Sequence, residues 1–216
     1  MIDLHTHSIF SDGELVPAET AQRAFAAGYK AIALTDHADY SNMDFIIPRI
    51  IRACARISEK GNITVIPGVE LTHVDPSDIA SLAAEAEKLG AKIIIVHGET
   101  LTEPVPSGTN RAAVSAGVDI LAHPGLITAE DARLAAEKGV FLEITTRRGH
   151  SFSNGHVAQM ARQCKAQLVI NNDAHAPGDF VGRQIAANIA RGAGLSEEEI
   201  ATMFKNSQKI VERACA

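Results

Sequence analysis

The chain has 216 residues, of which 46% are hydrophobic, and this length suits one sizeable core, so we expect a single domain over residues 1–216. A formal net charge of −6 and an aromatic content of 4% argue against nonspecific binding to an anionic membrane and against a nucleic-acid polymer as partner. Small-molecule chemistry is favoured instead.

Short runs rich in Ile and Val alternate along the chain with Ala-rich segments of helical periodicity. Four helices are predicted over residues 17–27, 49–60, 78–89 and 129–138, each followed by a glycine that can end a helix. Pro48 is placed at the first turn of the second, because proline fits poorly inside a helix. A last helix begins at Ser196, where Glu199 completes a capping box, and runs toward Arg213. Seven strands are predicted over residues 2–4, 31–34, 63–66, 92–96, 119–122, 140–144 and 168–170.

This alternation predicts parallel strands joined by right-handed helical crossovers, in an open sheet or in a closed barrel. The loop after the first strand contains neither GxGxxG nor GxxxxGK[ST], so the common nucleotide-binding forms of the open sheet have no support. Composition by itself does not separate the two architectures.

Six of the nine histidines fall at or just after the end of a predicted strand, and acidic residues share these positions. In parallel α/β folds the carboxyl ends of the strands meet on one face, so residues remote in sequence become neighbours there. We therefore expect a cage of imidazoles and carboxylates. Its predicted members are His5, His7, His37, His97, His123, His175, Asp36, Glu70, Glu143 and Asp173.

The first strand presents the clearest metal clamp. His5 and His7 are two residues apart on extended chain and point to the same side. Asp12 can return to the site because Gly13 permits a tight turn. Imidazole and carboxylate ligands without cysteine suit Zn²⁺, Mn²⁺ or Fe²⁺, and argue against a closed structural zinc site.

Other candidates have simpler explanations. For His73, His150 and His156 a structural or solvated role is favoured, because each lies deeper in a loop or helix. The acidic residues at 14, 19 and 197–199 are expected to be solvated or capping charges. The three cysteines are far apart and odd in number, which is typical of free thiols. With no run of 18 apolar residues and no signal-peptide pattern, we expect a soluble cytoplasmic protein.

The segments DLHTHSIFSDG, LTDH, PGVE, VHGE, AHPG and NNDAH, in this order, resemble the motifs of the polymerase and histidinol phosphatase (PHP) superfamily across essentially the whole chain. The resemblance implies a distorted (β/α)₇ TIM-like barrel with a trinuclear metal site at the C-terminal face of its strands. Two to three divalent ions, Zn, Mn or Fe, are the implied cofactors. The implied ligands are His5, His7 and Asp173 for one ion, Glu70 bridging to a second ion at His97 and His123, and His37, His175 and Asp12 for a third.

The resemblance also implies a phosphoesterase, and we expect a small phosphomonoester as substrate. No cysteine or GxSxG serine presents itself as nucleophile, whereas close metal ions can turn a bridging water into hydroxide and neutralise the phosphate. Glu70, Asp173 and His123 therefore count as catalytic. Asp36 and Glu143 are expected to orient ligating histidines. The expected substrate contacts are Arg147 after the sixth strand, Arg183 as a second candidate, and His73, which could protonate the leaving alkoxide.

Two alternatives stay open. One is a phosphodiesterase or exonuclease acting on nucleotides, and the other is a noncatalytic, regulatory metal-binding module. The negative charge and only two tyrosines disfavour a nucleic-acid polymer, and the nearly complete ligand set favours catalysis. Substrate identity, metal identity, oligomeric state and the position of the C-terminal helix do not follow from the sequence.

Overall fold

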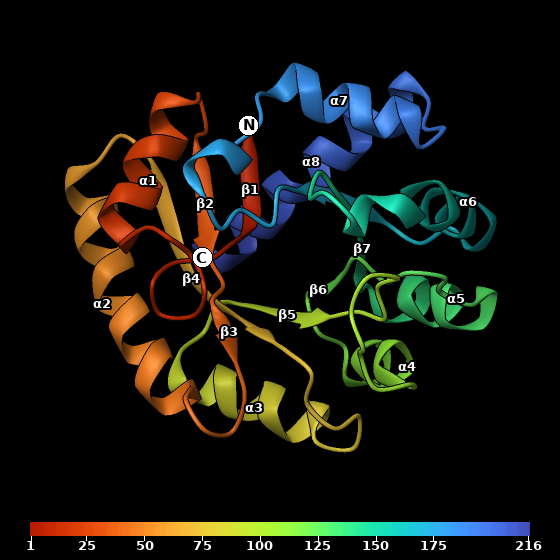
Figure 1. Ribbon diagram of the computed structural model, residues 1–216, viewed down its shortest axis with the longest axis horizontal. Coiled ribbons are helices and arrows are strands. Elements are labelled where there is room, and N and C mark those ends of the chain that lie inside the picture. Colours follow the sequence, from red (N-terminus) through yellow and green to blue (C-terminus); the bar gives the residue numbers. More distant parts are fainter.

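Seven parallel strands form the wall of a nearly closed barrel, and helices surround it (Figure 1). The computed structural model describes all residues from 1 to 216. A two-residue strand, β3 (His37–Ala38), pairs with β4 (Thr64–Leu71) in the same register as β2 (Ala31–Leu34), which pairs with an earlier part of β4. The order around the wall is β1 (Ile2–Thr6), β2 (Ala31–Leu34), β4 (Thr64–Leu71), β5 (Ile93–His97), β6 (Ile120–Ala122), β7 (Phe141–Thr145) and β8 (Leu168–Asn171).

The seam between β1 and β8 closes this wall through few contacts. Thr6 and Ala174 form an isolated parallel bridge, and the amide of His7 donates to the carbonyl of Ala174 at 2.8 Å. The amide of Leu4 donates to Asn171 Oδ1 at 2.9 Å, so a side chain replaces a backbone partner there. The predicted distorted (β/α)₇ barrel is therefore confirmed.

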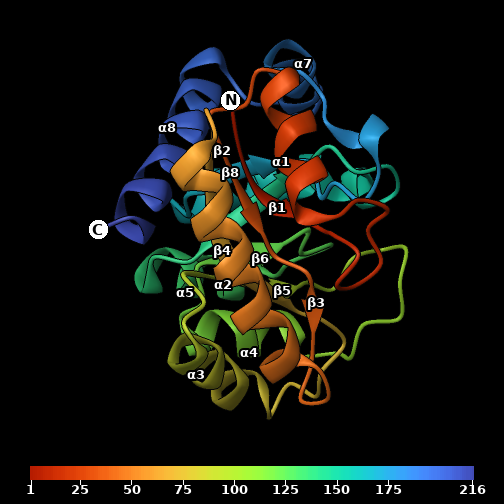
Figure 2. The same cartoon turned by 90° about the vertical axis from the view of Figure 1, so that its left-hand side faces the viewer.

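Eight helices and two short 3₁₀ turns connect the strands. Figure 2 shows α1 and α2 lying in front of β1 and β2. A cluster of 34 buried apolar residues fills the space between the wall and the helices. No helix has both the length and the apolar character needed to cross a bilayer. The helices are α1 (Pro17–Ala26), α2 (Met43–Lys60), α3 (Ile79–Leu89), α4 (Thr109–Ala116), α5 (Ala129–Lys138), α6 (Asn154–Cys164), α7 (Arg183–Gly192) and α8 (Glu197–Ala214), and the turns are η1 (His150–Ser153) and η2 (Pro177–Asp179).

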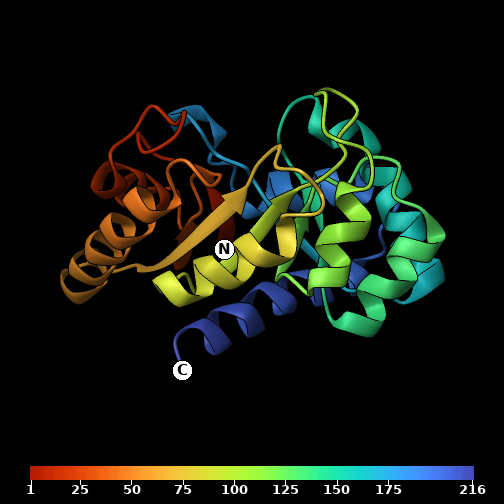
Figure 3. The ribbon, with the colours of Figure 1, turned by 90° about the horizontal axis from the view of Figure 1, so that it is seen from below.

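The barrel interior is apolar at its lower end, where α8 covers it. Ile210 and Val211 of α8 belong to the same buried cluster as Leu4, Ile95 and Val169 on the strands. Figure 3 shows α8 beneath the strands, with the long loops on the opposite side. The C-terminal helix therefore forms the floor of the barrel, and the polar loops are left to build its mouth.

The structure corrects two predicted boundaries. Helix α2 begins at Met43, not near Arg49, and Pro48 lies inside it. Proline removes one backbone bond, but Pro48 is on the exposed side, and the buried face with Ile46 and Ile50 favours the longer helix. The third predicted strand ends at residue 66, whereas β4 continues to Leu71 because it pairs with β5 over its last four residues.

Candidate metal centre

The alternating pattern of the strands changes from apolar to polar at the mouth of the barrel. On β5, Ile93 and Ile95 face the interior cluster, and His97 follows them on the same face. On β7 the corresponding pair is Phe141 in the interior and Glu143 above it. His97 and Glu143 face the same way as the apolar residues below them, because strand alternation continues past the end of the apolar core.

Strand β1 departs from this alternation. Leu4 belongs to the interior cluster, yet the next residue, His5, contacts Glu70 and Glu143 at the mouth. The register between β1 and β2 shifts between Asp3 and Thr6, and this irregularity lets two consecutive side chains face inward.

The predicted ligand residues meet at this mouth. His5 Nε2 lies 3.2 Å from Glu70 Oε1, and His7 Nε2 lies 3.2 Å from Asp173 Oδ1. Together with His123 these residues form what we call the inner cluster, whose members are at most 3% exposed. Beside it, His175 Nε2 lies 3.2 Å from Asp12 Oδ1. Groups whose ligand atoms all lie within 4.8 Å of one another are His5/His7/Glu70, His5/His123/Asp173, His7/Asp12/His37/His175, His97/His123/His150 and His73/His97/Glu103.

Unpaired polar atoms in the inner cluster fit a cation. Of the seven buried side-chain nitrogen and oxygen atoms without a hydrogen-bond partner, five belong to it. Such atoms cost about 1–3 kcal/mol each when nothing compensates them, and a convergent set of nitrogen and carboxylate donors is the composition of a divalent-metal site. The five atoms are His5 Nε2, His7 Nδ1, His7 Nε2, Glu70 Oε1 and His123 Nδ1.

The charges of the cluster lead to the same conclusion. Burial by itself would raise the pKa of Glu70, but His5 and His37 lower it well below its usual value. The pKa of Asp173 is likewise held well below its usual value, against burial, by His5 and His7. Burial lowers the pKa of His7 to about 3. The cluster therefore contains ionised buried carboxylates and, at His7, an uncharged imidazole, and both are forms that bind a metal ion.

Protein oxygens orient several of the rings. The carbonyls of Gly98 and Asp173 lie 3.2 Å and 2.9 Å from Nδ1 of His97 and His175 respectively, and a carbonyl can only accept. Nδ1 of His5 lies 2.9 Å from Glu143 Oε1. Each of these rings is thus held through Nδ1, which leaves its Nε2 on the side that faces the mouth.

The two carboxylates expected to orient histidines differ in what they contact. Glu143 accepts from His5, from the amide of His123 at 3.1 Å and from Asn171 Nδ2 at 2.8 Å. Asp36 instead accepts from the amide of Ser8 at 2.7 Å, and its other hydrogen bonds also go to the loop after β1. The structure thus gives Glu143 histidine contacts, whereas Asp36 holds the loop that leads to Asp12.

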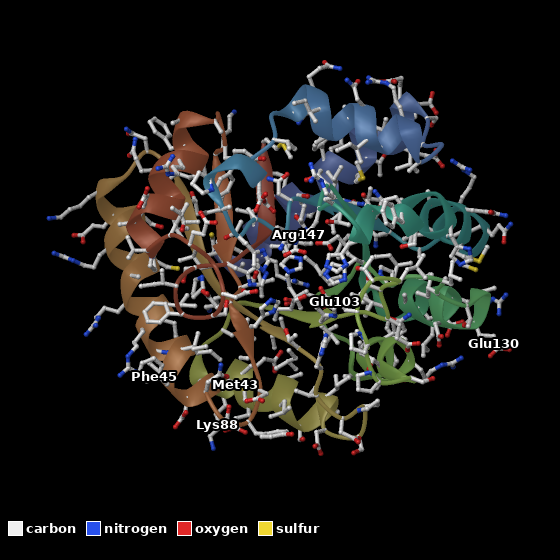
Figure 4. The ribbon with its side chains drawn as sticks, viewed as in Figure 1. Met43, Phe45, Lys88, Glu103, Glu130 and Arg147 are labelled. Atoms are coloured by element: carbon white, nitrogen blue, oxygen red, sulfur yellow. The ribbon has the colours of Figure 1, made fainter.

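The structure brings one of the two predicted arginines to the mouth. Arg147 Nε lies 3.5 Å from Asp173 Oδ2, and Figure 4 shows Arg147 and Glu103 at the centre of the ring of strands. Arg147 also lines a cavity of about 520 Å³ with Thr146, Asn172 and Asp179. Arg183 is not brought there, because its guanidinium packs 3.9 Å from the centre of the Phe204 ring, between α7 and α8.

Two residues at the mouth were missed in the sequence. Glu103 Oε2 lies 3.0 Å from His97 Nε2 and 3.4 Å from His73 Nε2, and its contact with His97 lowers the pKa of Glu103 to about 2. His150, which the sequence assigned to a structural or solvated role, stacks on His123 with 4.2 Å between ring centres. Both residues lie in loops away from strand ends, so no periodicity marked them.

Comparisons with known proteins find relatives over nearly the whole chain. The chain is 45% identical to an uncharacterized protein of Methanocaldococcus jannaschii over 98% of each chain. It is 28% identical to a protein named "Probable phosphatase" from Thermoanaerobacter sp., over 92% of this chain and 88% of the relative. It is 26% identical to the ribonuclease P protein component 3 of Methanosarcina barkeri, over 91% of this chain and 82% of the relative.

A solved structure has the same fold. The crystal structure of a candidate histidinol phosphatase from Listeria monocytogenes superposes with a TM-score of 0.61 at 10% identity, over 83% of this chain and 97% of the other. At this identity the likeness concerns the fold alone. The family model described as the PHP domain matches residues 3–114, a range that includes His5, His7, Glu70 and His97. The chain belongs to the PHP family.

Proposed function

We propose that this protein is a metal-dependent phosphoesterase that hydrolyses a small phosphomonoester. The observation that carries the proposal is the set of unpaired buried donors in the inner cluster, directly beside the guanidinium of Arg147. The donors suit divalent cations, and the guanidinium suits a phosphate. Membership of the PHP family supports the same class of hydrolase.

The proposed assignment of ligands follows the groups that the barrel brings together. Divalent ions bound there would lower the pKa of a water nucleophile and neutralise charge on the phosphoryl oxygens. Zn²⁺, Mn²⁺ and Fe²⁺ all match the donors. The assignment is His5, His7 and Asp173 to one ion, Glu70, His97 and His123 to a second ion with Glu70 shared between these two, and Asp12, His37 and His175 to a third.

The chain's own side chains would then bind and orient the ester. Arg147 would donate to phosphate oxygens, because its Nε lies 3.5 Å from Oδ2 of the proposed ligand Asp173. His73, 38% exposed and 3.4 Å from Glu103, is placed to contact the leaving group. We include Arg147 but not Arg183 in the substrate site, because the guanidinium of Arg183 already packs on Phe204.

The decisive experiment measures phosphate release from a panel of phosphomonoesters that includes histidinol phosphate. Metal is first removed, and Mn²⁺, Zn²⁺ or Fe²⁺ is then restored singly. We expect metal-dependent turnover that is lost in Asp173→Asn and in His123→Ala and kept in His156→Ala. His156 is the matched control because its Nε2 contacts the carbonyl of Ile127 at 2.8 Å. Absence of turnover with every ester, in protein shown to hold metal, would overturn the proposal.

Action on a phosphodiester or nucleotide is the second candidate. The relative named as a ribonuclease P component is the observation that favours a nucleic-acid connection, whereas the net charge of −6 disfavours a polymer. Nucleotides and a phosphodiester in the same assay separate the two. A metal-loaded protein that cleaves neither class would be assigned to the noncatalytic, regulatory alternative.

A further inference from the structure

His150 lies at the mouth of the barrel without belonging to any predicted ligand set. It opens the turn η1 after β7 and is 6% exposed. Its ring stacks on His123 at 15° between planes, and it lies edge-on to His97 with 5.8 Å between ring centres. The imidazoles of His97, His123 and His150, from three separate segments of the chain, thus surround one side of the site.

The contacts of His150 distinguish its two ring nitrogens. Nδ1 lies 2.7 Å from the hydroxyl of Thr100 and 3.2 Å from that of Thr102. Nε2 lies 3.4 Å from Glu103 Oε1 and 4.0 Å from Asp173 Oδ2. Threonine hydroxyls can accept from Nδ1–H, and Nε2 is then unprotonated and able to bind a cation beside these carboxylates. This is the arrangement in which a histidine serves as a ligand while its other nitrogen is held by the protein.

The backbone around His150 holds this position firmly. Gly149 has φ of 90°, which favours glycine, and a Cβ there would approach Thr102 Cγ2 to 3.3 Å. The turn before His150 therefore packs directly on the loop that supplies Thr100, Thr102 and Glu103. The loops after β5 and β7, which are far apart in the sequence, thus pack against each other where the His150 ring enters the site.

We propose that His150 is a further ligand of the ion assigned above to Glu70, His97 and His123. The ligand atoms of His97, His123 and His150 lie within 4.8 Å of one another. Three imidazoles at one corner favour Zn²⁺, Fe²⁺ or Co²⁺ over Mg²⁺, which prefers oxygen ligands. This inference rests on the metal centre of the proposed function, but it does not depend on which ester is cleaved.

The test measures metal binding in the absence of substrate. Metal-free wild type, His150→Ala, His150→Gln and the control His156→Ala are titrated with Zn²⁺, and bound metal is counted after dialysis. We expect wild type and His156→Ala to bind alike. Both His150 variants should lose one equivalent of metal, or bind it about 10- to 100-fold more weakly, the range found when the support of a metal site is removed.

His150→Gln guards against a simple loss of folding, because glutamine retains a group that can bond to Thr100 but is a poor ligand for Zn²⁺. Circular dichroism and the melting temperature of the metal-free variants confirm that the barrel is intact. The visible absorption of bound Co²⁺ gives a second readout, since its intensity changes with the number and geometry of ligands. A spectrum that changes in both His150 variants and not in His156→Ala supports the proposal.

Equal stoichiometry, with dissociation constants within about twofold of wild type in both His150 variants, would overturn the inference. If wild-type protein binds metal but hydrolyses no ester, the proposed function is wrong, but the metal-binding test of His150 remains valid. Wild-type protein that binds no divalent ion would overturn both. The failure of the ligand assignment is thereby distinguished from the failure of the phosphatase assignment.

Discussion

His5 Nδ1 lies 2.9 Å from Glu143 Oε1, and both side chains are fully buried. The contact joins β1 to β7 across the mouth of the barrel, and Glu143 also accepts from the amide of His123 at 3.1 Å. One carboxylate thus positions two of the proposed ligands. Burial would lower the pKa of His5, but Glu70 and Glu143 raise it well above its usual value.

Glu143→Gln should weaken metal binding. The amide is close in size but lacks the charge that holds the proton on Nδ1 of His5, so we expect about a 10- to 100-fold loss of affinity. Titration of the metal-free protein with Zn²⁺ measures it. Glu137→Gln, at an exposed position of α5, is the control. Identical titration curves for both variants would show that Glu143 does not support the centre.

Arg147→Ala should weaken substrate binding without removing metal. A hydrogen bond to a charged group contributes about 1.5–3 kcal/mol, so KM should rise about 10- to 100-fold. Arg147→Lys should recover only part of this loss, because an ammonium cannot make the paired contact of a guanidinium. Steady-state kinetics on the best ester, with metal content measured in parallel, test the prediction. Arg133→Ala, on an exposed site of α5, should behave as wild type.

Ile210 should contribute strongly to stability because it closes the floor of the barrel. It is 1% exposed and belongs to the interior cluster. Ile210→Ala should lower the free energy of unfolding by about 2–5 kcal/mol. Ile185→Ala, at a position 52% exposed, should change it by less than about 0.5 kcal/mol. Urea denaturation measures both, and a small effect at Ile210 would mean that α8 does not seal the barrel in solution.

The pH dependence of stability should include a contribution from Glu199. Arg162 and the amide of Ser196 lower the pKa of this carboxyl from 4.5 to about 2. A depressed pKa stabilises the fold above pH 4.5, and this stabilisation is lost as pH falls toward 2. Because the pair is partly exposed, Glu199→Gln should cost at most about 1 kcal/mol at pH 7.

The difference between wild type and Glu199→Gln should shrink steadily when urea denaturation is repeated down to pH 3. The exposed neighbour Glu198, changed to Gln, provides the control. A difference that stays constant over this pH range would mean that the ionised carboxylate of Glu199 is not the stabilising group.

Cys54 should be the least reactive of the three thiols. It is 2% exposed, and burial raises its pKa to about 12, whereas Cys215 is exposed. A thiolate is the reactive form, so alkylation at pH 8 should modify Cys215 first and Cys54 only after unfolding. Mass spectrometry of peptides from native and urea-treated protein gives the order. Rapid native labelling of Cys54 would mean that the packing between α2 and the strands opens readily.

The alternation of strands and helices, and the residues at strand ends, could be read from the sequence. Strand periodicity is local, so the position of His97 relative to the core followed from a few neighbouring residues, whereas the inward position of His5 depends on the register shift in β1. The common direction of parallel strands then placed all nine predicted ligands on one face. The structure brings these nine together, and their roles as metal ligands stay a proposal.

The contacts between loops, and the packing of residues away from the mouth, could be known only from the tertiary structure. His150 and Glu103 lie 47 residues apart in the sequence, and they meet only because the loops after β5 and β7 pack on each other. Arg183 follows β8 but packs on Phe204 of α8. Helix α2 extends past Pro48 because tertiary burial outweighs one lost backbone bond. The sequence by itself determined which chemical groups lie at the strand ends that form the mouth, because strand periodicity is local. Only the closure of the barrel decided which loop residues complete the site. Those contacts join loops that are remote in the sequence and have no repeating hydrophobic pattern.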